Sequence, residues 1–193
     1  MPSPDRSPFV VGFGGTLGPI SSSRGVLACV LENCEEKGAE TRMFSGEDLN
    51  LPLYNPANSD RTAQASALVD SIRKADAIVI SSPGYHGAIS GLVKNAIDYV
   101  EDTSGDERPY FDQRPVGVIA VAAGWQATTS TMQSMRSIVH ALRGWPTPLG
   151  IAVNSMECNF TEHCRTVEDK AVIRQCALMA EQLIGFACNR IAE

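Results

Sequence analysis

A segment rich in glycine and hydroxyl side chains near the N-terminus has the composition of a phosphate-binding loop. It runs from Gly14 to Arg24, between a short apolar run and a stretch with helical periodicity. Glycines let backbone N–H groups curve around an anion, and the N-terminus of the following helix adds partial positive charge. Hydroxyl donors come from Thr16, Ser21, Ser22 and Ser23, and Arg24 offers a full charge. We expect this segment to hold phosphate; the alternative is a solvent-exposed loop in which Ser22 only caps the helix.

The spacing of the glycines argues against a dinucleotide or a nucleoside triphosphate as the ligand. A dinucleotide-binding loop has the pattern G-x-G-x-x-G, and here Leu17 stands where the third glycine belongs. The expected second strand closes with Met43-Phe44-Ser45, which offers no acidic side chain to a ribose. The Gly-Lys-Ser/Thr signature of a triphosphate-binding loop is absent as well. A terminal phosphate, such as that of FMN, suits a hydroxyl-rich loop better.

Two further loops carry residue types suited to a flat aromatic ligand. The segment 82–87 contains Pro83, Gly84 and Gly87, which hold a turn and expose backbone amides beside the planar side chains of Tyr85 and His86. Backbone donors aimed at a flavin ring tune it as an electron acceptor. In the segment 123–127, Gly124 allows close backbone approach and Trp125 offers a ring that would cover a ligand. The alternatives are a surface histidine, a tyrosine at the edge of the core and ordinary packing of the tryptophan.

These three loops follow the first, third and fourth of five expected strands that alternate with helices. The strands are expected at 9–13, 39–44, 77–81, 116–121 and 149–153, and the helices at 23–37, 62–75, 90–100, 129–142 and 166–191. This alternation predicts an α/β fold, with a three-layer, doubly wound, five-stranded parallel sheet in the order 2-1-3-4-5. In such sheets the ligand binds beyond the carboxyl ends of the strands, where the first and third strands lie side by side. The three loops should therefore meet at that place.

Taken together, the loops resemble those of the NADPH-dependent FMN reductase family of the flavodoxin-like superfamily. The segment 14–23 looks like the phosphate loop of that family, and the segment 82–98 looks like its ring-contacting loop and following helix. Leu51-Pro-Leu-Tyr54 also matches a typical segment, so that the resemblance spans about residues 9–155. It implies that the FMN phosphate is held by Thr16, Ser21, Ser22 and Ser23, and that the ring is lined by Pro83, Gly84, Tyr85, His86 and Gly87, with Ala123, Gly124 and Trp125 on its other side.

Two positions depart from the family pattern. Many members carry arginine where this chain has Gly18, so a contact to a phosphate or to the nucleotide is expected to be missing here, and Arg24 is a candidate substitute. Asparagine is common where this chain has His86, which changes the part of the pocket that faces the second substrate.

The resemblance implies hydride transfer from NADPH or NADH to FMN, with the chemistry carried by the flavin and no catalytic side chain. Ser21, Ser22 and Ser23 lie in no G-x-S-x-G nucleophile elbow. Either the reduced FMN is supplied to a partner flavin-dependent monooxygenase, or a quinone or another small oxidant is reduced directly on bound FMN. Two rivals stay open. One is a flavodoxin-like electron carrier without NAD(P)H activity, although the first loop lacks T-x-T-G-N-T, and the other is a non-flavin phosphate-binding module on the same fold.

The overall composition indicates one ordinary globular domain. The 193 residues carry a formal net charge of −6, which gives no basic footprint for nucleic acid or for an anionic membrane. No apolar run approaches the roughly 20 residues of a membrane span, and the first one is too short for a signal peptide, so we expect a cytoplasmic protein. Residues 1–8 are expected to be a flexible tail, and residues 9–193 a single FMN-binding domain.

The six cysteines form no Cys-x-x-Cys pair and indicate reduced thiols in a cytosolic compartment. Cys158, His163 and Cys164 lie close in sequence, but a fourth ligand at suitable spacing is missing, and we expect no metal. Members of the family are usually dimeric or tetrameric, with the flavin near a subunit interface, so a homodimer or homotetramer is expected. We hypothesise that the charged and flexible segment Glu101–Arg114 helps to form the dimer or covers the flavin.

Overall fold

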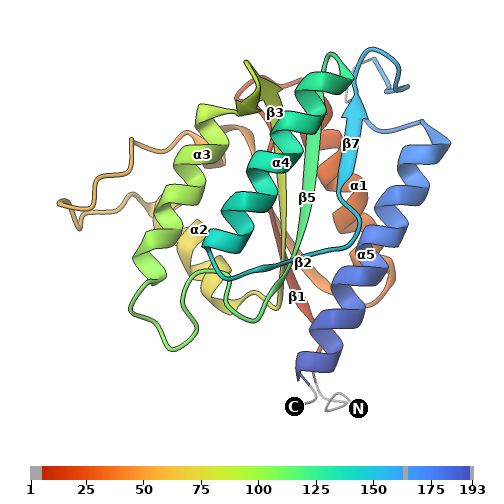
Figure 1. The fold of residues 1–193 in the computed structure, drawn as a ribbon. Coiled ribbons are helices and arrows are strands. Elements are labelled where there is room, and N and C mark those ends of the chain that lie inside the picture. The colour runs from red at the N-terminus through yellow and green to blue at the C-terminus, as the bar shows by residue number, and fades with distance from the viewer. Residues whose placement is uncertain (1–5, 163–164, 192–193) are drawn as a thin grey trace.

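The computed structural model describes residues 6–162 and 165–191, in which strands alternate with helices along the chain (Figure 1). The strands are β1 (Phe9–Gly14), β2 (Glu40–Phe44), β3 (Ala77–Tyr85), β4 (Ala88–Ile89), β5 (Pro115–Ala122), β6 (Trp145–Pro146) and β7 (Ile151–Asn154). The helices are α1 (Ser22–Glu36), α2 (Ala63–Lys74), α3 (Gly91–Asp98), α4 (Trp125–Ala141) and α5 (Lys170–Ile191), with short 3₁₀ turns at Gly46–Leu49 and Tyr99–Thr103. All five expected strands and all five expected helices are present, with shifted bounds.

The strands form one sheet in the order β2-β1-β3-β5-β6, and β7 also pairs with β5. The expectation of five strands is wrong, because the described sheet has seven. The two additional strands, β4 and β6, have two residues each. β4 pairs with β3 in the antiparallel sense, whereas β6 and β7 pair in parallel with successive parts of β5, at Pro115–Val116 and at Ile119–Ala122. β6 and β7 are thus two pieces of one interrupted edge.

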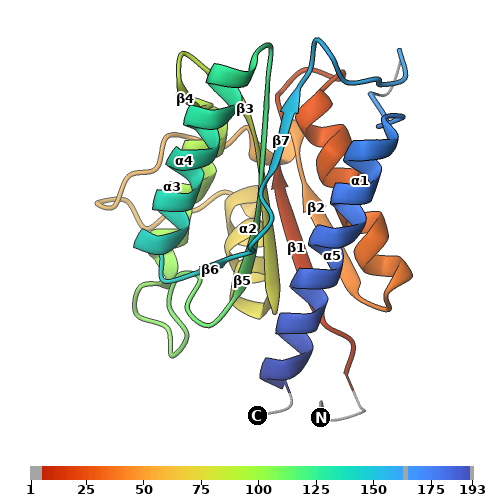
Figure 2. The ribbon, with the colours of Figure 1, turned by 45° about the vertical axis from the view of Figure 1, so that its right-hand side comes forward.

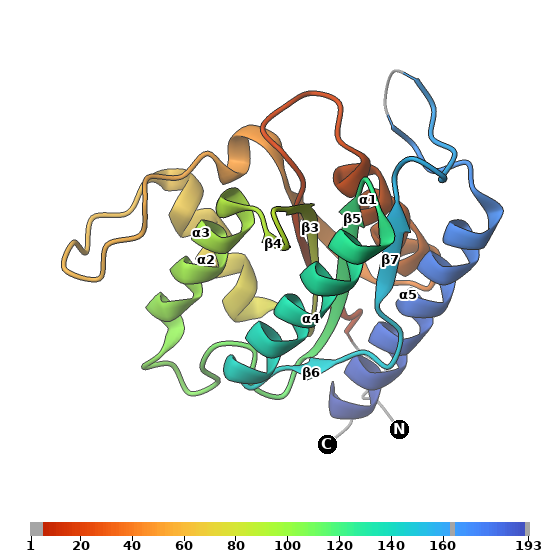
Figure 3. The same ribbon diagram turned by 45° about the horizontal axis from the view of Figure 1, so that its top comes forward.

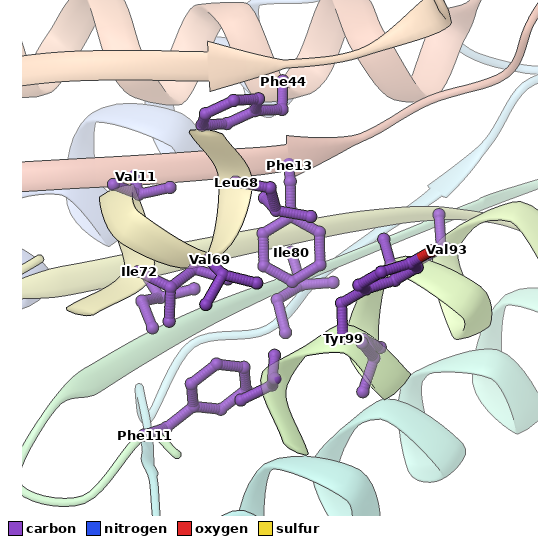
Figure 4. Packing of buried hydrophobic residues seen from close by; sticks show 14 of the residues in the cluster. Val11, Phe13, Phe44, Leu68, Val69, Ile72, Ile80, Val93, Tyr99 and Phe111 are labelled. Carbon is purple, nitrogen blue, oxygen red and sulfur yellow. The ribbon is translucent and has the colours of Figure 1, made fainter. Parts of the chain in front are cut away.

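Helices cover both faces of the sheet, which gives the expected three layers (Figure 2). On one face α1 and α5 pack against β1, β3, β5 and β7, through residues such as Leu27, Ile119 and Met179. On the other face lie α2, α3 and α4, where Phe13, Leu68 and Ile80 pack together in the core (Figure 4). All eight residues of β5 are buried, as an unbroken apolar run in a central parallel strand predicts.

The starts of α4 and α5 each differ by four residues from expectation, and the shift of α4 affects the third loop. The helix begins at Trp125 and not near Thr129, because Gly124 occupies its N-cap with φ of 144°. The loop expected at 123–127 therefore shrinks to Ala123 and Gly124, and Trp125 becomes the first residue of a helix. The end of α1 agrees with expectation, since the N–H of Gly38 (φ 86°) donates to the carbonyl of Glu35.

Residues 6–8 differ from the expected flexible tail, because they bond to the body of the fold. Both Nη atoms of Arg6 donate to the Asp76 carboxylate at 2.8 Å, and the Pro8 carbonyl accepts from Glu40 N–H at 2.9 Å. Asp76 also accepts from the N–H of Phe9, so it fixes the point where β1 begins. Residues 1–5 lie outside the described part of the chain.

The segment Glu101–Arg114 is packed against the fold and is not a free arm. Phe111, Arg114 and Thr103 are 0%, 1% and 1% exposed. The segment leads into the first residue of β5. It lies at the end of the sheet opposite the carboxyl ends of β1 and β3 (Figure 1). The hypothesis that it covers the flavin of its own chain is therefore wrong, whereas its part in a dimer stays a prediction.

By length and composition alone, α5 is the one described helix that could cross a membrane. In the fold, however, Cys176, Met179 and Leu183 of α5 are fully buried in the core that it shares with α1 and the sheet. These three residues thus have a packing role within this domain, whereas Ile173 and Leu178 of the same helix are exposed.

Burial of Arg114 yields a prediction about stability. Its guanidinium donates to the carbonyls of Ala75, Tyr110 and Arg73 at 2.8–2.9 Å, and burial lowers the pKa of Arg114 to about 10. Arg114→Met leaves buried carbonyls without these donors, so we expect a loss of about 2–4 kcal/mol in the free energy of unfolding, measured with urea. The control Arg174→Met, on the exposed side of α5, should change it by less than about 0.5 kcal/mol. Equal stability of the two variants would contradict the role given to Arg114.

Candidate functional site

The carboxyl ends of β1, β3, β5 and β7 lie at the same end of the sheet (Figure 3). Residues at and beyond these strand ends line one cavity of about 340 Å³. Its wall draws on all three loops singled out in the sequence, and this volume falls in the range of small-molecule sites. The lining residues are Thr16, Ile20, Ser21, Ser22, Ser23, Pro83, Gly84, Tyr85, Val121, Ala122, Ala123 and Ser155. Of the residues expected in the site, eight line the cavity, and His86, Gly87, Gly124 and Trp125 lie beside it.

Close contact between the ends of β1 and β3 shapes the floor of the first loop. A Cβ on Gly14 (φ 147°) would overlap the carbonyl oxygen of Ser81, so only glycine fits there. That same carbonyl accepts from the N–H of Gly15 at 3.2 Å, while the Ser81 hydroxyl donates to the Ser23 carbonyl at 2.8 Å. These contacts hold the start of α1 directly above the β1–β3 boundary.

The serines of the first loop have different roles. Ser21, and not Ser22, caps α1, because its Oγ accepts from Arg24 N–H at 3.3 Å. The hydroxyls of Ser21 and Ser23 are 3.1 Å apart, and both residues are buried. Ser22 is half-buried, lines the cavity and accepts from Nε of Arg165 at 3.0 Å. Ser21 therefore caps the helix, and Ser22 and Ser23 are not needed for this role. All three serines line the cavity.

Arg24 does not supply charge to this cavity. Its side chain is exposed and lines a separate cavity of about 440 Å³ with Cys29, Glu32 and Thr166. The suggestion that Arg24 compensates for the glycine at position 18 is therefore wrong, because the side chain leaves α1 on a different side.

The second loop, residues 82–87, forms the end of β3 and the turn of a tight hairpin. β3 extends to Tyr85, and β4 returns from Ala88, with Tyr85 paired to Ala88. The two-residue turn between them has positive φ at both His86 (51°) and Gly87 (85°), as in a type I′ turn. Asparagine and histidine tolerate this conformation better than most residues, which explains why either suits position 86. His86 is exposed and does not line the cavity, whereas Pro83, Gly84 and Tyr85 form part of its wall.

Ser82 and Gly84 fix this hairpin against the rest of the fold. The buried Ser82 hydroxyl donates to the Pro83 carbonyl at 2.9 Å and accepts from Ser90 N–H at 3.0 Å. A Cβ on Gly84 would lie 2.6 Å from Oγ1 of Thr131 on α4, so the hairpin packs tightly on that helix. The wall residues of this loop are thus held rigidly.

Trp125 stands at the rim of the site. Its side chain is 54% exposed, and its Nε1–H donates to the Glu157 carboxylate at 3.1 Å. Glu157 in turn accepts from Nδ2 of Asn154 at 2.5 Å, at the carboxyl end of β7. This chain of bonds fixes the indole beside the cavity, while Tyr85, 53% exposed, stands at the rim as part of the wall.

Sequence reasoning missed the residues that follow β7. Ser155 lines the cavity because its N–H donates to the Ala122 carbonyl at 2.9 Å, and Glu157 and Arg165 contact Trp125 and Ser22. Ligands in such folds bind beyond the carboxyl ends of the strands, and this rule applies to the loop after β7 as well. The rule could therefore have identified this loop from the sequence.

The segment 51–54, which resembles the family pattern, is tied to α3. Nδ2 of Asn95 donates to the carbonyls of Leu51 and Pro52, and Oδ1 of Asn95 accepts from Tyr54 N–H at 2.9 Å. The OH of Tyr54 donates to Asp102 at 3.1 Å, and the Arg61 guanidinium beside Asp102 lowers the pKa of that carboxyl. Asn95 and Asp102 therefore have structural roles in anchoring this segment.

Within residues 6–162 and 165–191, no three His, Cys, Asp or Glu side chains are grouped as a metal site. Burial raises the pKa of the Cys158 thiol to about 11, which disfavours the thiolate that a metal requires. His163 and Cys164, the neighbours weighed in the sequence, lie outside the described residues.

The cavity wall has the chemistry of a site for a phosphate and a flat ring. It contains hydroxyl groups and the first turn of α1 at one end, which suit an anion. At the other end it has the backbone of the rigid hairpin and of the β5–α4 junction, which suits a planar ring system. Among the residues that the structure describes, no charged side chain lines it, so the described wall offers groups for binding and orientation. These residues fit FMN.

The fold is a doubly wound α/β fold of flavodoxin-like type, and its cavity lies beyond the carboxyl ends of the strands. The sequence matches the profile of the family described as NADPH-dependent FMN reductase over residues 8–157. The chain therefore belongs to this family of oxidoreductases, whose members use FMN and NADPH.

Named relatives agree with this membership. The chain is 28% identical over 165 residues to the FMN-dependent NADPH-azoreductase of Staphylococcus aureus (strain USA300), covering 77% of this chain and 84% of that protein. It is 36% identical over 100 residues to the NADPH azoreductase of Bacillus sp. (strain OY1-2), but this match spans only 49% of this chain and 53% of the relative. The chain is thus aligned with about half the length of the Bacillus protein.

A solved structure shares the fold. The NAD(P)H:quinone oxidoreductase from Methanothermobacter marburgensis matches with a TM-score of 0.67, covering 92% of this chain and 96% of that chain. At 15% identity, this likeness supports the fold alone.

The Gly14 contact leads to a prediction about the first loop. Gly14→Ala forces β1 away from Ser81, so we expect a loss of at least about 2 kcal/mol and a Tm lower by about 4–8 °C, together with weaker FMN binding. Gly18→Ala is the matched control, because a Cβ there has its nearest neighbour at 3.7 Å, in ordinary contact. Scanning calorimetry and FMN titration of both variants test this. Similar results for both would contradict the steric role of Gly14.

Proposed function

We propose that the chain binds FMN in the cavity above β1 and β3 and oxidises NADPH through it. The observation that carries this proposal is that residues of the serine loop, the hairpin and the β5–α4 junction line one cavity, and that none of its described lining residues is charged. The FMN phosphate lies against Thr16, Ser21, Ser22 and Ser23 at the N-terminus of α1. The isoalloxazine ring lies between Pro83, Gly84 and Tyr85 on one side and Ala123 on the other, with His86, Gly87, Gly124 and Trp125 beside it.

When bound, FMN supplies the hydride and electron-transfer chemistry. This chain would contribute binding and orientation. Backbone groups of the Pro83–Gly84 segment and the N-terminus of α4 would hold the ring, and Ser82 and Gly84 brace the hairpin that carries the first of these groups. The serine hydroxyls and the α1 N-terminus would hold the phosphate. No side chain of the wall needs to exchange a proton.

The acceptor that the rim favours is a small flat oxidant reduced directly on bound FMN. Tyr85 and Trp125 are both more than half exposed beside the cavity, and each offers a ring face to an aromatic compound. A quinone or an aromatic azo compound has this shape, and the relatives described above are named for such acceptors.

The second candidate is release of reduced FMN to a partner flavin-dependent monooxygenase, as the family resemblance implies. An exposed rim and a half-exposed Ser22 permit the flavin to exchange. Retention of FMN through purification separates the two candidates, because a flavin that is a substrate dissociates, whereas one that serves as a cofactor stays.

We further propose that the protein is cytoplasmic and acts as a homodimer or homotetramer, with residues 9–193 as a single FMN-binding domain. The five described cysteines are free thiols, which agrees with a reducing compartment. Two exposed aromatic side chains at the rim would be covered by a second subunit placed near the flavin.

Absorbance spectroscopy tests the central proposal. Purified protein with FMN should show flavin bands that shift on binding, and anaerobic NADPH should bleach them faster than NADH does. Addition of a quinone or an azo dye should restore the bands. Flavin that binds without bleaching would indicate an electron carrier, and a protein that binds no flavin would overturn the proposal.

Replacement of the loop serines gives a second test. In Ser22→Ala/Ser23→Ala, each hydrogen bond lost to the charged phosphate costs about 1.5–3 kcal/mol, so FMN affinity should fall at least about tenfold. Fluorescence titration measures this, and Ser104→Ala at the far edge of the sheet is the control. FMN affinity equal to that of the control would remove these serines from the phosphate site.

A further inference from the structure

Within residues 6–162 and 165–191, the wall of the proposed phosphate site contains no positively charged side chain. The described lining residues are neutral, yet a phosphate monoester carries about −1.5 to −2 charges at pH 7. The partial charge of a helix N-terminus and several hydroxyl groups offset only part of this charge. A cation close to the wall would complete the site.

Among the described residues, one cationic side chain, that of Arg165, donates a hydrogen bond to a side chain of the wall. Its Nε lies 3.0 Å from the Oγ of Ser22, across 143 positions of sequence. A guanidinium has five N–H donors, and this bond uses one of them. Arg165 precedes α5 and reaches the first loop from the connection that leaves β7.

The backbone around Arg165 is held against α1. A Cβ on Gly25 would overlap the carbonyl oxygen of Arg165, so the two backbones touch in the first turn of the helix. The flanking chain is paired, with a bridge between Phe160 and Val167 and a 2.9 Å bond from Thr161 N–H to the Thr166 carbonyl. The guanidinium also lies 5.0 Å from the Phe160 ring centroid, which keeps its plane oriented. Arg165 is therefore placed by the fold and does not swing freely.

We propose that Arg165 is the phosphate-binding cation of the flavin site, supplied from the β7–α5 connection. The inference rests on the proposed FMN function and deepens it by assigning the missing charge. Ser22 links the guanidinium to the cavity, so the arginine orients the serine hydroxyl and donates its remaining N–H groups to the phosphate. Arg24 cannot take this role, because it lines a different cavity, and Gly18 has no side chain to offer.

Paired titrations with FMN and riboflavin test the assignment, because the two flavins differ only in the phosphate. The readout is quenching of flavin fluorescence, with no turnover required. In Arg165→Met, FMN affinity should fall about 10- to 100-fold while riboflavin affinity stays within about twofold of the native value. Arg165→Lys keeps the charge and should recover part of the FMN affinity. Arg24→Met, on the same loop but outside the cavity, is the control and should bind both flavins as the native protein does.

Each outcome decides a separate question. Native FMN affinity in Arg165→Met would overturn the role of Arg165 while leaving the flavin function intact. An equal loss for FMN and riboflavin would overturn it too, because the residue would then only support the loop. If the native protein binds neither flavin, the proposed function itself fails.

Discussion

The contact between Gly14 and the carbonyl of Ser81 is the constraint on which the rest of the site depends. Because residue 14 has no Cβ, β1 stays paired with β3 through Gly14, the last residue of β1, which lies opposite Ser81. The chain then turns through Gly15 toward α1. That turn sets the first N–H groups of α1 over the strand ends, beside the hairpin that continues β3. The serine loop and the hairpin, which line the two sides of the cavity, are therefore positioned by one close contact between two parallel strands.

Much of the architecture follows from local pattern. Apolar runs and helical periodicity predicted five strands and five helices, and the loops that mattered were identified because glycine, proline and serine gather at strand ends. The predicted boundaries of these elements were wrong where contacts between residues distant in sequence determine the local structure. Ser82–Gly87 has a loop composition, yet it forms a hairpin because Gly84 packs on Thr131 and Ser82 bonds to Ser90. α4 starts early because Gly124 adopts a backbone conformation that only the folded junction reveals.

Charge placement was the least predictable part of the site. Proximity in sequence favoured Arg24 as a neighbour of the serines, but a helix directs successive side chains about 100° apart, so Arg24 leaves the face that Ser22 occupies. The arginine that does contact Ser22 lies 143 positions away, and no local pattern connects the two. Ser155 and Glu157 were within reach of the same strand-end rule and were overlooked because their loop contains no glycine cluster.

The interrupted edge at β6 and β7 has a consequence for how copies of this chain can associate. Between β6 and β7, the four residues 147–150 lie opposite only two residues of β5, Gly117 and Val118. This border of the sheet therefore lacks a regular row of backbone donors and acceptors. Pro146 in β6 also has no backbone N–H to donate. At the other border, β2 has only five residues and exposes Arg42 and the charged end of Glu40. Such borders discourage an incoming strand from another molecule. Copies of this protein should therefore associate through their helices or through the aromatic rim of the cavity. We expect no sheet that continues from one subunit into the next.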